Sequence, residues 1–173
     1  LTVAPGTYAH SVTVAHLAET ACREIGANPL IARVGAYYHD IGKIDQPEYF
    51  IENQGGGRNK HDDINPRLSV TVIRSHVKLG VERARALGLP REVVDIVAQH
   101  HGNSLIPWFF DKARKKDAAA APEDYSYPGQ PPASREAAVV MLADAVEAAS
   151  RTLKRPSIGK LEDLVRGLAM ERV

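Results

Sequence analysis

The stretch Ala36-Tyr37-Tyr38-His39-Asp40-Ile41-Gly42-Lys43, "AYYHDIGK", ends an apolar helical segment in two strong metal-binding side chains. A glycine two residues after the aspartate is typical of a helix that stops there. A helix C-terminus carries partial negative charge, which favours a cation. Histidine and aspartate together suit a transition metal. The stretch therefore indicates a helix end that delivers ligands to a metal.

A second doublet, His100-His101, is also followed at once by a glycine, Gly102. Neighbouring residues on a helix diverge by about 100°, so two adjacent ligands reach one metal awkwardly. They serve two metals about 3.5–4 Å apart more easily. The two doublets together favour a two-metal cluster over a single ion.

Three further residues are candidate ligands: His10, His76 and Asp144. Asp144 lies among Ala, Val, Met and Leu in "VMLADAVEAA". A buried carboxylate is costly unless it is paired, neutralised or bound to a cation, although a helical carboxylate can also simply face solvent. A lone histidine is more often structural or exposed than a ligand, and we interpret His16 in that way. Mixed imidazole and carboxylate donors suit iron, manganese or zinc better than calcium.

The bulk composition is that of one soluble globular domain spanning residues 1–173, with 44% hydrophobic and 25% charged residues. The net charge of +1 does not favour binding to polymeric nucleic acid. Cys22 is the only cysteine, which excludes an internal disulfide and cysteine-based zinc or redox motifs and fits a reducing compartment.

The first 18 residues form the longest stretch without Asp, Glu, Lys or Arg. They contain Pro5, Gly6 and two histidines, and so fall short of the roughly 20 apolar residues of a membrane helix. They also lack the positively charged start of a signal peptide. Because the chain begins at Leu1 and not at methionine, we expect a piece of a longer or processed protein.

Apolar periodicity and cap signals predict an all-α fold, without convincing β-type alternation or internal repeats. The expected helices run from Thr7 or Ser11 to about Gly26, over residues 30–40, 67–87, 91–101, 106–116 and 135–153, and onward from about Ile158. Residues 45–66, with Pro47 and a run of three glycines, predict a mobile loop. Residues 117–134 are the least structured part.

The order His10, His39-Asp40, Asp144 resembles the signature of the HD superfamily of metal-dependent phosphohydrolases. Over residues 5–156 the chain also resembles the cytoplasmic domain of the seven-transmembrane-HD proteins, which are membrane-anchored cyclic-di-AMP phosphodiesterases. The segments that carry this resemblance are "PGTYAHSVTVAHLAE", "IGANPLIARVGAYYHDIGKIDQPEYFIENQ", "SHVKLGVERA", "QHHGNSLIPWFF" and "YPGQPPASREAAVVMLADAVEAASRTL". The resemblance implies an HD-domain helical bundle with a buried two-metal centre.

The resemblance also assigns ligands to two divalent ions, iron or manganese. One ion would be held by His10, His39, Asp40 and Asp144. The other would be held by His76, His100 and His101, with Asp40 bridging the two.

The activity that the resemblance implies is hydrolysis of cyclic-di-AMP to linear pApA by water activated between two metals. Asp40 and Lys43 would be catalytic, Lys43 by offsetting charge on the phosphate. A solvated lysine near a helix end is the plain alternative for Lys43. "GNSLIPW" follows the histidine doublet where the relatives that cleave cyclic-di-GMP carry Gly-Tyr-Pro, which counts against that substrate.

Two other functions stay open at this point. The domain could bind cyclic-di-AMP as a silent sensor, although its complete ligand set favours an enzyme. It could also be an HD nucleotidase acting on mononucleotides, whose single metal would not need His76 or the His100-His101 pair.

The expected partners are cyclic-di-AMP and, through a missing N-terminal region, the cell membrane, with this domain in the cytoplasm.

In the glycine-rich loop, Arg58 and Lys60 could steer an anion and His61 and Asp62 could contact substrate, although a solvated loop is the simpler interpretation. Residues 108–110, Trp-Phe-Phe, are interpreted as aromatic core, with adenine stacking as the alternative.

Overall fold

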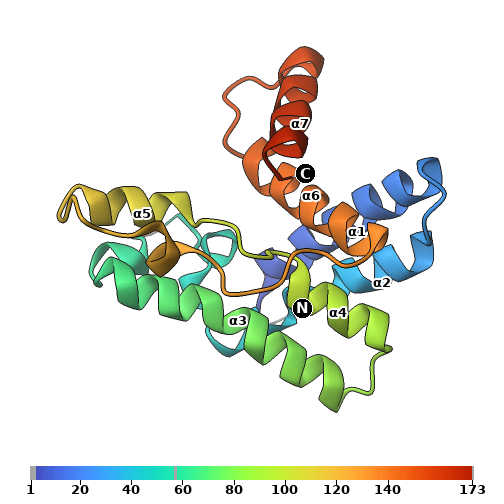
Figure 1. Cartoon of the computed structure of the whole chain (residues 1–173), viewed down its shortest axis with the longest axis horizontal. Helices are drawn as coiled ribbons and strands as arrows, with labels where there is room; N and C mark the ends of the chain where they lie inside the picture. Colours follow the sequence, from blue (N-terminus) through green and yellow to red (C-terminus); the bar gives the residue numbers. More distant parts are fainter. Residues whose placement is uncertain (1–2, 57, 173) are drawn as a thin grey trace.

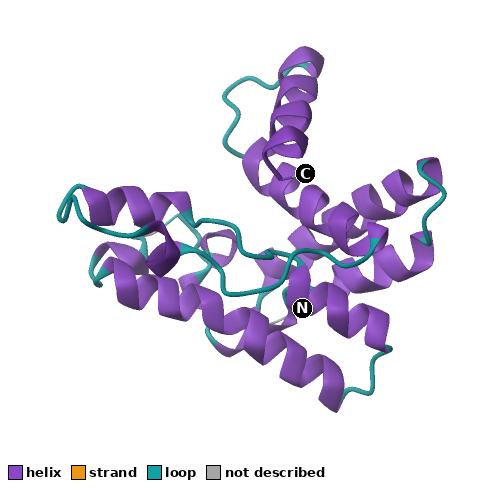
Figure 2. Cartoon of the chain, in the orientation of Figure 1, coloured by secondary structure: helices purple, strands orange, loops and turns teal. Residues whose placement is uncertain are grey.

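The computed structural model describes residues 3–56 and 58–172. Its α-helices are α1 (Pro5–Glu24), α2 (Pro29–Tyr38), α3 (Pro66–Ala86), α4 (Arg91–Gln99), α5 (Pro107–Arg114), α6 (Arg135–Ser150) and α7 (Ile158–Arg172). Within the described ranges there is no strand, as Figure 2 shows, and one isolated antiparallel bridge joins Leu105 to Ser126. The predicted all-α fold is confirmed. No helix in this part of the chain is long and apolar enough to cross a bilayer.

The main core lies where α1, α2, α4 and α6 meet (Figure 1). Its buried side chains are mostly small: Val14, Ala15, Ala18, Cys22, Ala27, Ala32, Ala36, Ile96, Ala137, Val140 and Ala143. Alanine-rich faces let the helix axes approach closely, which brings the polar residues on these helices together. The long helix α3 packs against α4, whereas α7 packs on α6, projects from the bundle and buries none of its residues.

The first helix begins at Pro5, so the prediction of a cap at Thr7 or Ser11 was wrong. Proline is tolerated in the first turn because the missing N–H would have no helical partner there. Thr7 lies inside the helix, where its hydroxyl donates to Glu52 Oε1 at 3.1 Å. This residue therefore makes a long-range contact in place of a cap.

The segment expected to be a mobile loop, residues 45–66, contains three short 3₁₀ helices at Pro47–Tyr49, Ile51–Asn53 and Lys60–Asp62, and a fourth, Ile41–Asp45, leads into it. Gly57, one of its three consecutive glycines, lies outside the described residues. Phe50 and His61 are buried. The interpretation of His61 as a solvated loop residue is wrong, because its Nε2 lies 2.8 Å from the Tyr49 carbonyl and its ring packs against Phe109.

The region between α5 and α6 is tied to the segment that follows the histidine doublet. A short 3₁₀ helix, Pro122–Tyr125, buries Tyr125 against α3 and α5. The Ile106 N–H donates to the Tyr125 carbonyl at 2.8 Å, and the Tyr127 N–H donates to the Ser104 carbonyl at 2.9 Å. These two main-chain bonds place Tyr127 beside the doublet.

Gly42 allows the chain to run directly against α3 just after Asp40. A Cβ at this position would lie 2.0 Å from the His76 carbonyl oxygen and 2.5 Å from the Gly80 nitrogen. Only glycine fits such a close approach of two backbones. The contact holds Asp40 next to His76, although 36 positions separate them in the sequence.

Replacing Gly42 by alanine should therefore lower the free energy of unfolding by at least about 1–3 kcal/mol, the usual cost of overpacking. The matched control is Gly55→Ala, because a Cβ at Gly55 meets no heavy atom within 4 Å. Urea denaturation, followed by circular dichroism, measures the free energy of unfolding of both variants. Equal stability of the two variants would contradict the proposed close approach.

Candidate metal centre

Each doublet stands where a helix ends, as its sequence predicted. His39 is the C-terminal cap residue of α2, and Asp40 follows outside the helix. His100 caps α4, and the chain then turns at Gly102, whose φ of +52° lies in the left-handed region that favours glycine. The helix ends thus aim two pairs of adjacent side chains at one point.

The first group joins α1, α2 and α6 through His10, His39 and Asp144. His10 Nε2 lies 3.1 Å from Asp144 Oδ1 and 3.5 Å from Asp40 Oδ2. His39 Nε2 lies 3.3 Å from Asp40 Oδ2 and 3.9 Å from Asp144 Oδ1. Two imidazoles and two carboxylates therefore meet at this side of the cluster.

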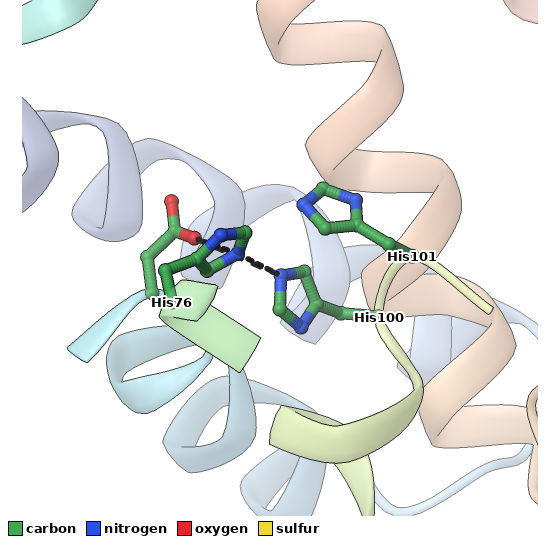
Figure 3. Close-up of side chains that lie close together, drawn as sticks. His76, His100 and His101 are labelled. Carbon is green, nitrogen blue, oxygen red and sulfur yellow. Dashed lines mark hydrogen bonds and ion pairs between the residues drawn. The ribbon is translucent and has the colours of Figure 1, made fainter. Parts of the chain in front are cut away.

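The second group comprises Asp40, His76, His100 and His101. Figure 3 shows the three histidines, His76 on α3 and the doublet after α4, with their rings gathered around one region. His76 Nε2 lies 3.2 Å from His100 Nε2 and 3.4 Å from Asp40 Oδ1. Asp40 thus presents Oδ1 to this group and Oδ2 to the first. His101 Nδ1 also lies 3.6 Å from Asp144 Oδ2.

The chemistry of this cluster fits bound cations. His39, Asp40, His76 and His100 are each at most 1% exposed. Four buried atoms lack a hydrogen bond: the Nε2 atoms of His10 and His39 and both carboxylate oxygens of Asp40, although Lys43 Nζ lies 2.6 Å from Oδ2 as an ion pair. Buried polar atoms without partners are costly, and metal ions bound in the two groups would satisfy all four. The donor set of imidazole and carboxylate suits a divalent transition metal.

Three of the histidines are oriented by main-chain carbonyls. In each ring Nδ1 lies within hydrogen-bond distance of the carbonyl three residues earlier: His39 to Ala36 at 2.6 Å, His76 to Ile73 at 2.5 Å and His100 to Val97 at 2.8 Å. A proton on Nδ1 leaves the Nε2 lone pair facing the cluster, as a metal ligand requires.

Charge is distributed unevenly over the cluster. Burial lowers the pKa of His76 to about 4 and that of His100 to about 3, so both rings are neutral at physiological pH. Burial also acts to lower the pKa of His39, but the carboxylates of Asp40 and Asp144 outweigh it and raise that pKa to about 9. Burial opposes ionisation of Asp40, yet His39 and Lys43 hold its pKa well below the usual range.

The metal-free protein should therefore release protons when it binds Mn²⁺. The His39 ring carries a proton below a pH of about 9, and a metal must displace that proton, so affinity should rise with pH between about pH 6 and pH 8. Isothermal titration calorimetry in buffers of different ionisation enthalpy measures the release, expected at about one proton or more per chain. Affinity that is independent of pH in this window would contradict the charge assigned to His39.

Lys43 is clamped between two carboxylates. Its Nζ lies 2.6 Å from Asp40 Oδ2 and 2.9 Å from Glu52 Oε1, with the side chain only 12% exposed. Burial disfavours its charge, but Asp40 and Glu52 raise its pKa above the usual value. The simple alternative of a solvated lysine is therefore wrong.

The cluster forms one wall of a cleft of about 870 Å³. Ligand candidates that line it are His10, His76, His101 and Asp144, and Lys43, Glu52, Trp108, Tyr127 and Arg151 are among its other lining residues. Trp108 is 49% exposed there, whereas Phe109 is buried. The prediction of aromatic core is confirmed for Phe109 and wrong for Trp108, whose ring contacts Phe109 edge-on but stays half exposed.

Three charged candidates of the glycine-rich loop do not line this cleft: Arg58, Lys60 and Asp62. They are paired with their neighbours: Arg58 with Asp63, Lys60 with Glu48 at 3.3 Å and Asp62 with Lys112 at 3.5 Å. His61 is buried apart from the cluster, and His16 is exposed on α1. The geometry therefore gives none of these residues a place beside the cluster.

Three residues at the site did not stand out in the sequence. Glu147 Oε2 lies 2.5 Å from His10 Nδ1, Glu52 contacts Lys43, and the Tyr127 ring stacks on His101 at 4.1 Å between centroids. Glu147 could have been found, because it follows Asp144 by three residues and so shares its helix face. The contacts of Glu52 and Tyr127 depend on the tertiary fold and have no local signal.

Comparison with known proteins places this chain among related sequences. A family model for the HD domain matches residues 7–149. The chain is 49% identical over 173 residues to cyclic-di-AMP phosphodiesterase PgpH of Bacillus subtilis strain 168, covering 100% of this chain and 24% of that protein. It is 43% identical over 169 residues to cyclic-di-AMP phosphodiesterase PgpH of Listeria monocytogenes strain 10403S, and this match covers 98% of this chain and 24% of that protein. The chain thus spans about a quarter of the length of these relatives.

A solved structure has the same fold. The HD domain of L. monocytogenes phosphodiesterase PgpH, in complex with cyclic-di-AMP, matches with a TM-score of 0.96 at 42% identity. The match covers 99% of this chain and 80% of that one. Helical architecture and chain order are therefore shared over nearly the whole domain.

Proposed function

This chain belongs to the HD domain family, and on that premise we propose that it hydrolyses cyclic-di-AMP to the linear dinucleotide pApA as a metal-dependent phosphodiesterase. We propose further that residues 1–173 form a single domain of a longer protein. The resemblance to seven-transmembrane-HD proteins and the greater length of the two relatives support a domain that is held at the membrane and faces the cytoplasm.

The observation that carries this proposal is the position of Asp40 between the two ligand groups. Its Oδ2 faces His10 and His39, and its Oδ1 faces His76 and His100. A carboxylate that serves both groups supports two ions that share one ligand. We therefore assign one ion to His10, His39, Asp40 and Asp144, and the other to Asp40, His76, His100 and His101. The donors suit iron or manganese.

Two such ions, when bound, supply a nucleophilic water at neutral pH and offset charge on the phosphate. The protein's own residues position the ligands and add a positive charge beside them. Asp40, buried and anionic, keeps the two ligand groups at a short separation. Lys43 adds a positive charge at the cleft wall, fixed by Asp40 and Glu52, where negative charge grows as the phosphodiester is attacked.

The cleft offers complementary groups for a cyclic dinucleotide. The exposed ring of Trp108 can stack an adenine, and Arg151 and Arg172 on the cleft lining can face a phosphate. His101 of the second histidine doublet also lines this cleft. These groups are the ones we propose for substrate contact.

The direct test is an anaerobic turnover assay with cyclic-di-AMP, cyclic-di-GMP and pApA, after loading with Mn²⁺ or Fe²⁺. Separated products are expected to show conversion of cyclic-di-AMP to pApA. The Asp40→Ala variant should fall to background, and Glu162→Gln, on the exposed helix α7, should retain full activity. Tight binding of cyclic-di-AMP without turnover under either metal would contradict the enzyme and favour a sensor. Cleavage of AMP alone, assayed in parallel, would favour a nucleotidase.

Removing the charge of Lys43 should slow the chemical step. The Lys43→Met variant is expected to lose about 100-fold in kcat, the usual cost of one charge-stabilising group, and Lys43→Arg should lose less. Lys78→Met is the control, because Lys78 is a surface residue of α3. Rates are measured at saturating substrate with metal content determined for each protein. An unchanged kcat in Lys43→Met would contradict a catalytic role.

A further inference from the structure

His10 is oriented differently from the three histidines that use main-chain carbonyls. Its Nδ1 lies 2.5 Å from Glu147 Oε2, a contact between residues 137 positions apart. Its other nitrogen, Nε2, faces Asp144 Oδ1 at 3.1 Å. One imidazole therefore has a carboxylate at each end.

Both carboxylates come from a single turn of α6. Asp144 and Glu147 are three residues apart, so their side chains leave the same face of the helix. Asp144 lies on the side of the ring that faces the first ligand group, and Glu147 lies on the far side. Docking of α6 against α1 thus fixes the ring of His10 from both directions.

Glu147 is itself held in place. It is 8% exposed, and its second oxygen, Oε1, accepts hydrogen bonds from Arg151 Nε at 2.8 Å and Nη2 at 2.5 Å. Arg151 is four residues further along the chain, at the end of α6, and its side chain is 44% exposed. The chain Arg151–Glu147–His10 therefore runs from the cleft rim to the buried cluster.

We infer that Glu147 is a positioning residue for the metal centre: it accepts the Nδ1 proton of His10 and so turns the Nε2 lone pair toward the ion shared with His39 and Asp144. This inference rests on the proposed two-metal function. A carboxylate that accepts this proton fixes the tautomer and makes the imidazole a stronger ligand, and loss of such a partner usually costs about 10–100-fold in metal affinity. Arg151 keeps the carboxylate aimed at the ring.

A purely structural role makes a different prediction. Methionine is close to glutamate in size and can still fill the space beside His10, but it cannot accept the Nδ1 proton. If Glu147 only packs α6 onto α1, Glu147→Met should leave metal binding unchanged.

The test is metal binding, not turnover. Mn²⁺ is titrated into metal-free wild type, Glu147→Met, Arg151→Gln and the surface control Glu162→Gln, in competition with a chelator. Wild type and Glu162→Gln should bind two ions per chain with the same affinities. In Glu147→Met one of the two ions should bind about 10–100-fold more weakly, and in Arg151→Gln the loss of affinity should be smaller.

A second readout is the His10 Nδ1–H signal in the proteins loaded with diamagnetic Zn²⁺, followed by NMR of ¹⁵N-labelled histidine. Wild type should hold this proton in a hydrogen bond with slow exchange against solvent, and Glu147→Met should exchange it faster. Unchanged affinity and unchanged proton exchange in folded Glu147→Met would overturn the inference while leaving the proposed function intact. If Glu147→Met does not fold, wild-type affinity in Arg151→Gln would overturn the inference instead. A wild type that binds no Mn²⁺ would overturn both proposals.

Discussion

The arrangement of this domain depends on one buried carboxylate, Asp40, with imidazoles on either side. A charge removed from water in this way must be compensated, because an isolated buried carboxylate costs several kcal/mol. Lys43 supplies one positive charge, yet both oxygens of Asp40 also face histidine nitrogens that need a common partner. Metal ions between these groups would meet the requirement, so metal binding and folding are expected to be coupled.

The fold brings the ligands together around Asp40 by means of helix ends and small residues. Two helices stop at the doublets, so that adjacent side chains which would diverge on a continuous helix can converge. Gly42 lets the segment after Asp40 lie against α3, and alanine faces let α1, α2 and α6 pack closely. These close approaches of backbone and helix faces therefore hold the ligands of the polar cluster together. Such a setting holds ligands in position before the metal arrives.

Much of the candidate site could be predicted from the sequence, because its strongest signals are local. Each doublet carries its own helix-stop glycine, and Asp144 stands among apolar residues. All seven predicted ligands lie in the two groups. Glu147 had a local signal, because it shares the helix face of Asp144, although its partner His10 is 137 residues away. Thr7 and Glu52 meet across 45 positions, and no local pattern encodes that contact. His61 was misread because its glycine-rich neighbours suggest solvent, whereas aromatic packing buries it.

One buried centre is expected to hold two ions through seven side chains, with Asp40 as the ligand common to both ions. Anomalous diffraction at the manganese edge, from crystals of the Mn²⁺-loaded domain, locates these ions. Two anomalous peaks are expected, one among His10, His39, Asp40 and Asp144 and one among Asp40, His76, His100 and His101. A single peak, or a peak that Asp40 does not contact, would contradict this expectation.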